Sequence, residues 1–403
     1  MERVVITGLG VISPIGIGQA AYVDALRRGV CGAGPITSFD TTGYRTAHGC
    51  EAGDFVTEPV ALPDGSVERD RAALLALAAA EEAAEDAGLA AAGFDPWRLG
   101  VVMATSLGGI LCMDQYLTDA ITVRQPADPS LFLHTCPSIT GVIAQKYGAR
   151  GPTITVSTAC AAGTNSVGYA FDLVRTGRCT AVLCGGTDPF TRLSFSGFNS
   201  LKSLSRGLAR PFSRDRDGLV LGEAAAVLVL ESLSSARARG ARIYAEVLGY
   251  GISNDAYHAT SPDPKGGGAV RAIRACLQEA GLTPDDVDYI NAHGTATKLN
   301  DGMELRAIVQ VFGERASRIP ISSTKSLIGH TLGCAGSIEA LTCALAIAHE
   351  FLPPTINLSE PVEGYEAFDF VRESRPCRIN VALSNSFAFA GNVAVIALGR
   401  CAA

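Results

Sequence analysis

The sequence predicts an α/β protein made of two similar halves. Short apolar, β-branched segments alternate along the chain with longer amphipathic segments, a pattern typical of largely parallel sheets. The composition, 47% hydrophobic and 18% charged over 403 residues, suits a large buried core. Each half opens with an apolar strand and later has a strand that leads into a reactive side chain. We place the boundary near Gly251, which gives an N-terminal half of residues 1–250 and a C-terminal half of residues 251–403.

The individual elements follow from apolar patterning and from residues that begin or end helices. Residues 3–9 are apolar on both faces, as a strand covered by helices on both sides should be. Residues 69–88 form an amphipathic, alanine-rich segment that ends on glycine, which indicates a long helix. Further strands are predicted at residues 101–106, 154–157, 179–187, 224–230, 243–251, 288–292, 321–323, 380–386 and 392–398. Further helices are predicted at residues 20–28, 167–176 and 337–348, and within residues 129–146 and 265–281.

Charge and cysteine usage exclude several classes of protein. A net charge of −7 argues against nucleic-acid binding, so an acidic partner would have to bind a local basic patch. The 12 cysteines show no metal-type spacing and no signal sequence precedes the first strand, so we expect a cytoplasmic protein with reduced thiols. No apolar run approaches the length that spans a membrane, and we expect no membrane association.

The stretch from Gly151 to Ala170 is predicted to form a buried strand, a sharp turn and a helix, with Cys160 on the turn. The positive end of the helix dipole and the free backbone N–H groups favour a thiolate at this position. Hydrolases carry a nucleophilic serine on a strand–turn–helix elbow of the same kind. The alternative is that Cys160 is a small buried hydrophobic residue, which is the commoner role of a cysteine.

Two histidines follow predicted strand ends in the second half. His293 lies in Asn291-Ala-His293-Gly-Thr-Ala-Thr, and His330 lies in Ser323-Thr-Lys-Ser-Leu-Ile-Gly-His330. A single histidine in such a place is more often structural. However, strand ends of α/β sheets are where functional sites gather. Together with a cysteine these histidines could also bind zinc, but no activated water or supporting carboxylate is evident, and we expect no metal site.

Acyl transfer on cysteine is the chemistry that these three residues suggest. A Cys160 thiolate would attack a thioester and take the acyl group, while backbone N–H groups at the turn stabilise the oxyanion. Neutral His293 and His330 would then donate hydrogen bonds to a second oxyanion, the enolate left when a β-carboxylate loses CO2.

The motifs together resemble those of the β-ketoacyl-ACP synthases. The resemblance covers the whole chain, and its motifs occur in the family's order. They are Val156-Ser-Thr-Ala-Cys160, Arg210-Pro-Phe-Ser-Arg-Asp-Arg-Asp-Gly-Leu-Val-Leu-Gly222, the two histidine motifs, and Ser384-Asn-Ser-Phe387. The group that this chain resembles is the elongating, stand-alone kind with a Cys-His-His triad.

The resemblance implies a thiolase-type fold, layered α-β-α-β-α, that assembles as a dimer. It implies that Cys160 takes an acyl chain from acyl carrier protein, and that His293 and His330 help malonyl-ACP to lose CO2. The resulting carbanion attacks the acyl-cysteine. No cofactor is needed, because the phosphopantetheine arm arrives on the carrier.

Further site residues are implied by the same resemblance. Lys325 matches the family's buried lysine, and Glu339 matches the glutamate that pairs with it. Thr295 and Thr297 match the threonines that hydrogen-bond the pantetheine arm. Phe389 matches the gating phenylalanine, whose backbone N–H joins that of the nucleophile in the oxyanion hole.

The chain departs from the family pattern in the gate loop. Ala388 and Ala390 stand where glycines are usual, and we expect them to stiffen the loop because alanine resists positive φ. Two other stretches, Asn300-Asp301 and Asn165-Ser-Val-Gly168, resemble ketosynthase subunits of type II polyketide systems, which pair with a homologous chain-length factor that lacks the cysteine.

Because this chain keeps Cys160, we interpret it as the catalytic partner in such a heterodimer. The alternatives are a homodimeric synthase that elongates fatty acids and a non-catalytic scaffold or chain-length subunit.

An acidic carrier needs a positive landing site. Lys202 falls where the family has a carrier-binding arginine, and Arg206, Arg69 and Arg71 are further candidates, although each could be a solvated surface charge. For the depth of the acyl pocket the candidates are the residues that follow the Gly108-Gly109 turn, namely Ile110, Cys112 and Met113.

Overall fold

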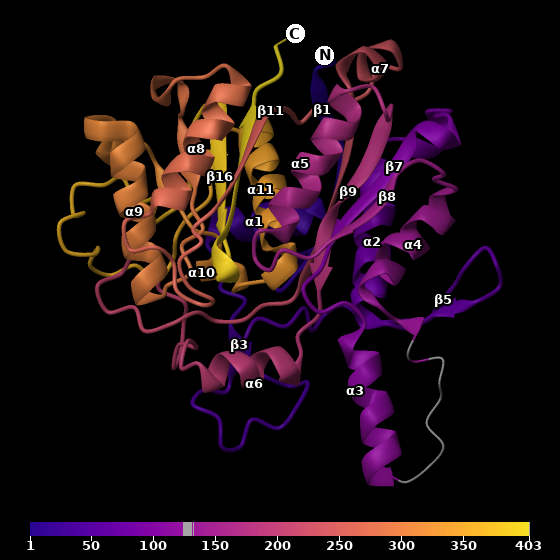
Figure 1. The fold of residues 1–403 in the computed structure, drawn as a ribbon, viewed down its shortest axis with the longest axis horizontal. Helices are drawn as coiled ribbons and strands as arrows, with labels where there is room; N and C mark the ends of the chain where they lie inside the picture. Colours follow the sequence, from indigo (N-terminus) through magenta and orange to yellow (C-terminus); the bar gives the residue numbers. More distant parts are fainter. Residues whose placement is uncertain (124–130, 132, 403) are drawn as a thin grey trace.

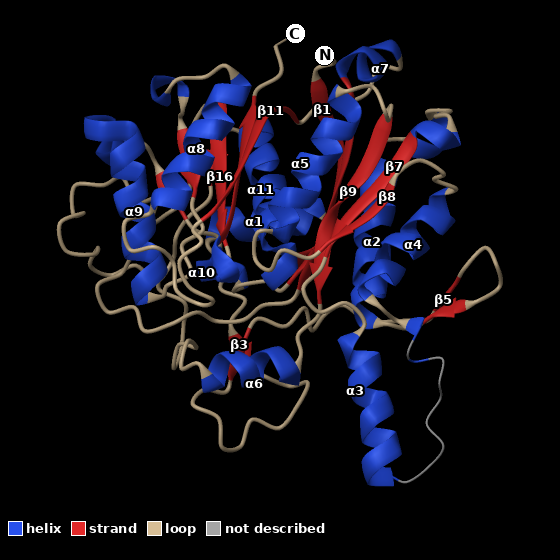
Figure 2. Cartoon of the chain, viewed as in Figure 1, coloured by secondary structure: helices blue, strands red, loops and turns tan. Residues whose placement is uncertain are grey.

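The computed structural model describes residues 1–123, 131 and 133–402, and its centre is one 11-stranded mixed sheet (Figures 1 and 2). The strand order is β13-β12-β16-β17-β11-β1-β10-β9-β7-β8, with β2 paired to β1. The first-half strands are β1 (Val4–Ser13), β2 (Gly16–Ile17), β7 (Leu99–Ala104), β8 (Thr153–Val156), β9 (Ala181–Asp188) and β10 (Ala224–Ser232). The second-half strands are β11 (Ala245–Asn254), β12 (Tyr289–Asn291), β13 (Ile321–Ser322), β16 (Val381–Phe387) and β17 (Asn392–Gly399).

The two halves of the sheet share one topology. Apart from the short β2, each half contributes five strands to the sheet. When these strands are numbered in chain order within their half, their order from the outer edge of the sheet to its centre is third, second, fourth, fifth and first. The two first strands, β1 and β11, pair antiparallel at Val4 with Val247 and join the halves. Gly251 lies within β11, so the division between residues 250 and 251 stays a prediction.

The prediction of largely parallel sheets is wrong. Only the outer pairs β7–β8, β7–β9, β12–β13 and β12–β16 of the described sheet are parallel, whereas its central pairs, from β9–β10 through to β16–β17, are antiparallel. The central strands are buried on both faces, so their apolar runs look like those of parallel strands. Strand direction is set by pairing with distant segments, which local patterning does not reveal.

Helices form three layers around the two half-sheets (Figure 1). Helices α5 (Ala162–Arg175) and α11 (Ala335–His349) pack on each other between the half-sheets and contact strands of both. Gly163 permits this approach, because a Cβ atom there would lie 2.4 Å from the backbone nitrogen of Ser337. Helices α2 (Arg71–Asp86) and α4 (Cys136–Tyr147) cover the first half, and α8 (Gly267–Ala280) with α9 (Lys298–Phe312) covers the second. The layering is therefore α-β-α-β-α, as expected.

Shorter elements complete the described chain. The helices are α1 (Gln19–Arg28), α3 (Ile110–Thr118), α6 (Arg192–Ser200), α7 (Leu233–Ala238) and α10 (Lys325–Ile328). The strand pairs are β3 (Gly34–Pro35) with β4 (His48–Gly49), β5 (Val60–Ala61) with β6 (Val67–Glu68), and β14 (Phe351–Leu352) with β15 (Arg375–Pro376). Helices α3, α6, α7, α9 and α10 were not predicted. Residues 129, 130 and 132 of the segment predicted at 129–146 lie outside the described residues.

One stretch of the described chain is long and apolar enough to span a membrane, so the expectation that no apolar run approaches that length is wrong. The 18 helical residues Leu332–His349 have a mean hydropathy of 1.4, but 89% of this stretch is buried inside the fold. It includes α11 and packs between the half-sheets, so its apolar character is explained by the core.

Candidate active site

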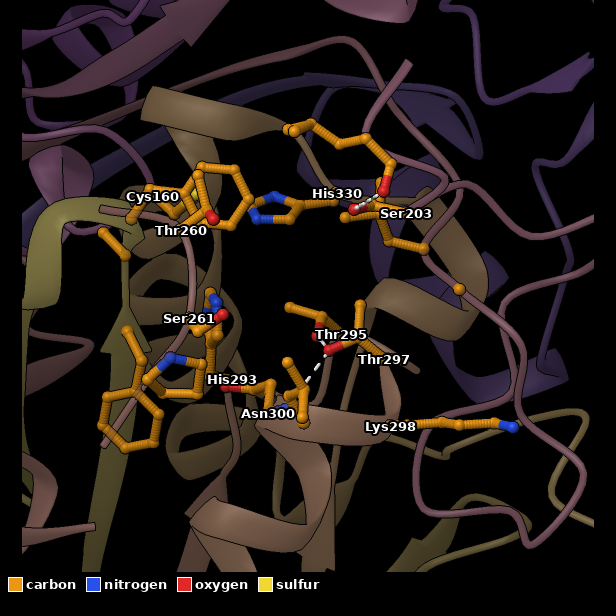
Figure 3. A pocket seen from close by; sticks show the side chains of 18 of the residues that line it. Cys160, Ser203, Thr260, Ser261, His293, Thr295, Thr297, Lys298, Asn300 and His330 are labelled. Carbon is orange, nitrogen blue, oxygen red and sulfur yellow. Dashed lines mark hydrogen bonds between the residues drawn. The ribbon is translucent and has the colours of Figure 1, made fainter. Parts of the chain in front are cut away.

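A cavity of about 370 Å³ brings together the three residues singled out as reactive, Cys160, His293 and His330 (Figure 3). They come from three separate segments of the chain, the turns after β8, β12 and α10. Among the other predicted residues, the cavity wall includes Thr295, Thr297, Phe389 and Lys202. The structure therefore assembles the expected constellation in one place.

Cys160 lies on a sharp turn between β8, which ends at Val156, and α5, which begins at Ala162. Ala159 adopts a φ of 50°, a left-handed conformation that costs an L-residue about 1–2 kcal/mol, and so the elbow is strained. Burial raises the pKa of the Cys160 thiol to about 12, although the nearby charge of Lys325 acts in the opposite direction. The helix start thus does not by itself give a resting thiolate, and the thiol must lose its proton as it reacts.

His293 follows β12, and a buried carboxylate fixes the backbone on which it sits. Glu304 of α9 accepts hydrogen bonds from the backbone N–H groups of His293 (2.9 Å) and Gly294 (2.8 Å), and from the side-chain amide of Asn385 (3.1 Å). Burial raises the pKa of Glu304 to about 7. This carboxylate orients the turn although it does not line the cavity.

Lys325 connects the two histidine segments. Its ammonium donates to Nδ1 of His293 (3.2 Å) and to the carboxylate of Glu339, and the lysine and glutamate side chains are only 3% and 1% exposed. An ammonium has no acceptor, so Nδ1 of His293 must accept and the ring proton must lie on Nε2. Burial raises the pKa of Glu339 to about 7, with Lys325 opposing the shift.

His330 has the same tautomer for a different reason. The backbone N–H of Leu332 donates to its Nδ1 (3.2 Å), which leaves the proton of a neutral ring on Nε2. Burial and the charge of Lys325 hold the pKa values of both histidines well below their usual value. The backbone of His330 is bound to the loop that ends at Gly222, through bonds with Val220 (2.7 Å) and Gly222 (2.9 Å). The site therefore presents two neutral imidazoles with Nε2–H donors.

Models of the β-ketoacyl synthase family match most of the chain, with the N-terminal domain over residues 1–236 and the C-terminal domain over residues 244–359. The chain belongs to this family. It is 42% identical over 409 residues to 3-oxoacyl-[acyl-carrier-protein] synthase 2 of Synechocystis sp., which covers 99% of this chain and 98% of that protein. It is 40% identical over 421 residues to the tetracenomycin polyketide synthase ketoacyl synthase alpha subunit of Streptomyces glaucescens, which covers 99% and 97%.

Solved structures of ketosynthases share the fold of this β-ketoacyl synthase. The ishigamide ketosynthase/chain length factor superposes with a TM-score of 0.93 at 41% identity over 100% of both chains. A ketosynthase bound to a hexaketide, in complex with its type II polyketide synthase acyl-carrier protein, gives a TM-score of 0.92 at 32% identity over 99% of this chain and 100% of that one. The predicted thiolase-type fold is confirmed, and the protein is a condensing acyltransferase.

Residues 388–391, which the resemblance predicts to form the gate and which we call the gate segment, lie at one edge of the cavity in this β-ketoacyl synthase. Phe389 packs against Phe198 with 5.6 Å between ring centroids. Ala388 has a φ of −120°, which any residue adopts, whereas Ala390 has a φ of 60°. The expected conformational conflict therefore falls on Ala390 alone. Its N–H donates to the carbonyl of Ala259 (2.8 Å), which holds the segment against the neighbouring loop.

Two threonines line the same cavity beside the histidines. The hydroxyls of Thr295 and Thr297 lie 3.0 Å apart and share a hydrogen bond. Thr297 also caps the N-terminus of α9 by accepting from the backbone N–H of Asn300 (3.3 Å).

The pocket-depth and carrier-binding candidates mostly lie elsewhere. Ile110, Cys112 and Met113 are on α3, outside the described cavity wall, and the thiol of Cys112 donates to Asp70 (3.5 Å). The exposed Arg206 and Arg69 do not line the cavity either, and Arg69 precedes α2 instead of lying on it.

Arg71 has an internal partner. Its guanidinium binds both oxygens of the buried Glu223, each at 2.7 Å. Of the four predicted carrier-binding residues, only Lys202 lies at the cavity.

Three features of the site escaped the sequence analysis. Glu304 lies on an unpredicted helix. Lys298 is exposed at the cavity mouth, beside the two threonines. Asp188, fully buried at the end of β9, accepts from the backbone of Ser106, Leu107 and Gly333. The sequence signal for Asp188 is a lone carboxylate at the end of an otherwise uncharged strand. Among the described residues, no group of three or more His, Cys, Asp or Glu side chains is arranged to hold a metal ion.

Proposed function

We propose that this chain is the catalytic ketosynthase subunit of a type II polyketide synthase, with Cys160 as the nucleophile. The observation that carries the proposal is the convergence of a thiol on a strained elbow with two neutral histidines in one cavity. A non-catalytic scaffold would have no need of this arrangement, so we set that alternative aside.

Acyl transfer is the first half-reaction. The sulfur of Cys160 attacks the carbonyl carbon of an acyl-pantetheine thioester, and the bond to the pantetheine sulfur breaks. Because both histidines carry their proton on Nε2, neither takes the thiol proton there, and the departing pantetheine sulfur receives it. The backbone N–H groups of Cys160 and Phe389 stabilise the tetrahedral oxyanion in this scheme.

Decarboxylation and condensation follow at the same place. Malonyl thioester loses CO2, and the electron pair of the broken bond becomes an enolate whose oxygen accepts from the Nε2–H groups of His293 and His330. Lys325 supports this step by holding Nδ1 of His293, and Glu339 holds Lys325 in turn. The enolate carbon then attacks the carbonyl carbon of the acyl-cysteine, the bond between that carbon and the cysteine sulfur breaks, and the sulfur takes a proton from the solvent. No step requires a metal or an organic cofactor.

The substrate arm enters on acyl carrier protein. Thr295 and Thr297 offer hydroxyls to the pantetheine amides at the cavity wall, and Lys202 with Lys298 offers positive charge to an acidic carrier. Two aspartates also line the cavity, but Asp217 is paired with Arg210 (3.3 Å) and Asp255 accepts from the backbone N–H of Asp263 (3.0 Å). Arg206 and Arg69 extend this docking surface in our proposal. Ile110, Cys112 and Met113 remain candidates for limiting the acyl chain if a partner subunit completes that pocket.

The retained cysteine supports a catalytic subunit over a chain-length subunit, and the relatives support the polyketide assignment. A tetracenomycin alpha subunit is 40% identical, and the ishigamide ketosynthase/chain length factor is 41% identical with a TM-score of 0.93. We therefore propose a cytoplasmic heterodimer with a homologous chain-length factor.

Intact-mass analysis of the native assembly, before and after incubation with acyl-ACP, tests the assignment. We expect a heterodimer that is acylated on this chain alone and not in Cys160→Ala. A wild-type assembly that gains no acyl mass would reject the proposed function.

A homodimeric fatty-acid elongating synthase is the second candidate. It is favoured by the 42% identity to 3-oxoacyl-[acyl-carrier-protein] synthase 2 over nearly the full length of both proteins. It predicts that this chain, purified alone, forms a homodimer and condenses saturated acyl-ACPs with malonyl-ACP. The same mass measurement therefore separates the two candidates.

A further inference from the structure

A chain of hydrogen bonds links β11, the first strand of the second half-sheet, to the elbow that carries Cys160. The hydroxyl of Tyr250, on β11, donates to the side-chain oxygen of Asn165 on α5 (2.5 Å). The amide nitrogen of Asn165 donates in turn to the hydroxyl of Thr158 (2.6 Å). Thr158 lies in the turn itself, two residues before the cysteine. The side chains of Tyr250, Asn165 and Thr158, which we call the elbow relay, therefore connect the opening strand of one half to the turn of the other.

The elbow needs such support because its backbone is strained. Ala159, between Thr158 and Cys160, has a φ of 50°, and a conformation of this kind persists only where its surroundings hold it. On one side the turn is continuous with α5, where the N–H of Ala162 bonds the carbonyl of Ala159 (2.9 Å). The Thr158 side chain is held on the other side by Asn165.

The Tyr250 ring packs directly against the backbone of Gly168. A Cβ atom at this position on α5 would lie 2.6 Å from three carbons of the Tyr250 ring. Any larger residue would therefore push the ring away from Asn165. Burial raises the pKa of Tyr250 well above its usual value, so the phenol keeps its proton and acts as the donor to the amide oxygen. With that oxygen engaged, the amide nitrogen must face Thr158.

We propose that the elbow relay is a positioning device that sets the orientation of the Cys160 nucleophile. Tyr250 fixes which way the Asn165 amide points, and Asn165 fixes the Thr158 end of the strained turn. The relay makes acyl transfer, but not decarboxylation, depend on Tyr250 of β11, the first strand of the second half-sheet. This inference rests on the proposed role of Cys160.

Tyr250→Phe tests the relay because it removes the hydroxyl and keeps the ring against Gly168. Two partial reactions are measured in the holo-assembly, acylation of Cys160 by acyl-ACP (rapid quench and intact mass) and decarboxylation of malonyl-ACP. We expect acylation to slow by roughly threefold to tenfold, the effect of one hydrogen bond, while decarboxylation changes less than twofold. Thr158→Val should give the same split, and the double variant should be no slower than either single variant.

Tyr244→Phe is the matched control. Tyr244 also donates from its hydroxyl, to Gln19 (2.9 Å) and Asp86 (3.0 Å), but it forms no hydrogen bond with a residue of the elbow relay, so its variant should leave both partial reactions unchanged.

The inference is overturned if Tyr250→Phe and Thr158→Val acylate at the wild-type rate, or if both partial reactions fall equally. Should Tyr250→Phe not fold, Thr158→Val carries the same test. Absence of acylation in the wild-type protein would instead reject the proposed nucleophile.

Discussion

The two halves share one strand topology but use the segment after their third strand differently. In the first half, β8 is followed by the short turn of residues 157–161, which presents Cys160 at the start of α5. In the second half, the longer segment of residues 323–334 after β13 carries Lys325 and His330 before α11 begins. One half thus supplies the proposed nucleophile under backbone strain, and the other supplies the two proposed hydrogen-bond donors. Of these, His293 is held by the buried Lys325–Glu339 pair and His330 by the backbone N–H of Leu332.

The segments after the second strands are more alike. In each half a buried carboxylate accepts two successive backbone N–H groups, Asp188 from Ser106 and Leu107 and Glu304 from His293 and Gly294. Burial raises the pKa of Asp188 to about 6 and that of Glu304 to about 7. The two halves thus share a buried carboxylate that supports a turn, but they differ in their reactive groups. We therefore predict that mutations can affect acylation of Cys160 and decarboxylation of malonyl-ACP separately.

The largest expected effect is that of Cys160→Ala. Without the sulfur no acyl-enzyme forms, so acyl transfer and condensation should fall by roughly 10³-fold or more. Decarboxylation of malonyl-ACP should persist, because it needs only the groups of the second half. Intact mass after exposure to acyl-ACP, together with CO2 release from malonyl-ACP, checks both statements. Persistent acylation of the variant would disprove the role of Cys160.

His330→Ala should give the opposite split. Removing one Nε2–H donor to the enolate should slow decarboxylation by about 10²–10³-fold, while acylation of Cys160 changes little. Both imidazoles should stay neutral from pH 8 down to pH 6 because their pKa values are lowered, so any change in the wild-type decarboxylation rate over this range is expected from Glu304 and Glu339, whose pKa values are about 7. Imidazole NMR signals of His293 and His330 that titrated through pH 6.5 would contradict the neutral rings.

Glu304→Gln should lower the stability of the second half, because Glu304 supports the turn that carries His293. An amide can direct only one oxygen at the N–H groups of His293 and Gly294, and leaving a buried donor unpaired costs about 1–3 kcal/mol of unfolding free energy. Urea denaturation measures this loss. Asp188→Asn is the matched change in the first half. It should lower the unfolding free energy to a similar degree, but it should slow decarboxylation of malonyl-ACP less than Glu304→Gln does.

The contribution of Glu304 to the unfolding free energy should decrease as the pH rises. The pKa of Glu304 is raised in the folded state, so its protonation stabilises the fold at low pH and that contribution is lost as the pH rises from about 4.5 through 7. The decline in unfolding free energy over this window should therefore be shallower in Glu304→Gln than in the wild type. Parallel profiles would mean that Glu304 does not titrate there.

Sequence alone predicted the residues that lie next to strand ends. Cys160 and His293 lie in the turns that follow β8 and β12, so local patterning placed these two correctly near strand ends, whereas His330 was expected after a strand and instead follows the unpredicted helix α10. It could not supply contacts made across the fold, such as the bonds from Glu304 to the His293 turn or the ion pair between Arg71 and Glu223. Strand direction failed for the same reason, because pairing partners lie far apart in the chain.

The smallest expected effect contrasts two alanines of the gate segment, Ala388 and Ala390. At Ala390, with a φ of 60°, glycine relieves a left-handed strain of about 1 kcal/mol, which offsets or exceeds the entropy that glycine adds to the unfolded chain. At Ala388, with a φ of −120°, glycine brings only that entropic cost, about 0.4–1 kcal/mol. Urea denaturation should therefore rank Ala390→Gly above Ala388→Gly by about 1 kcal/mol. The opposite ranking would show that the strain does not lie where the backbone angles place it, and that methyl contacts govern the gate instead.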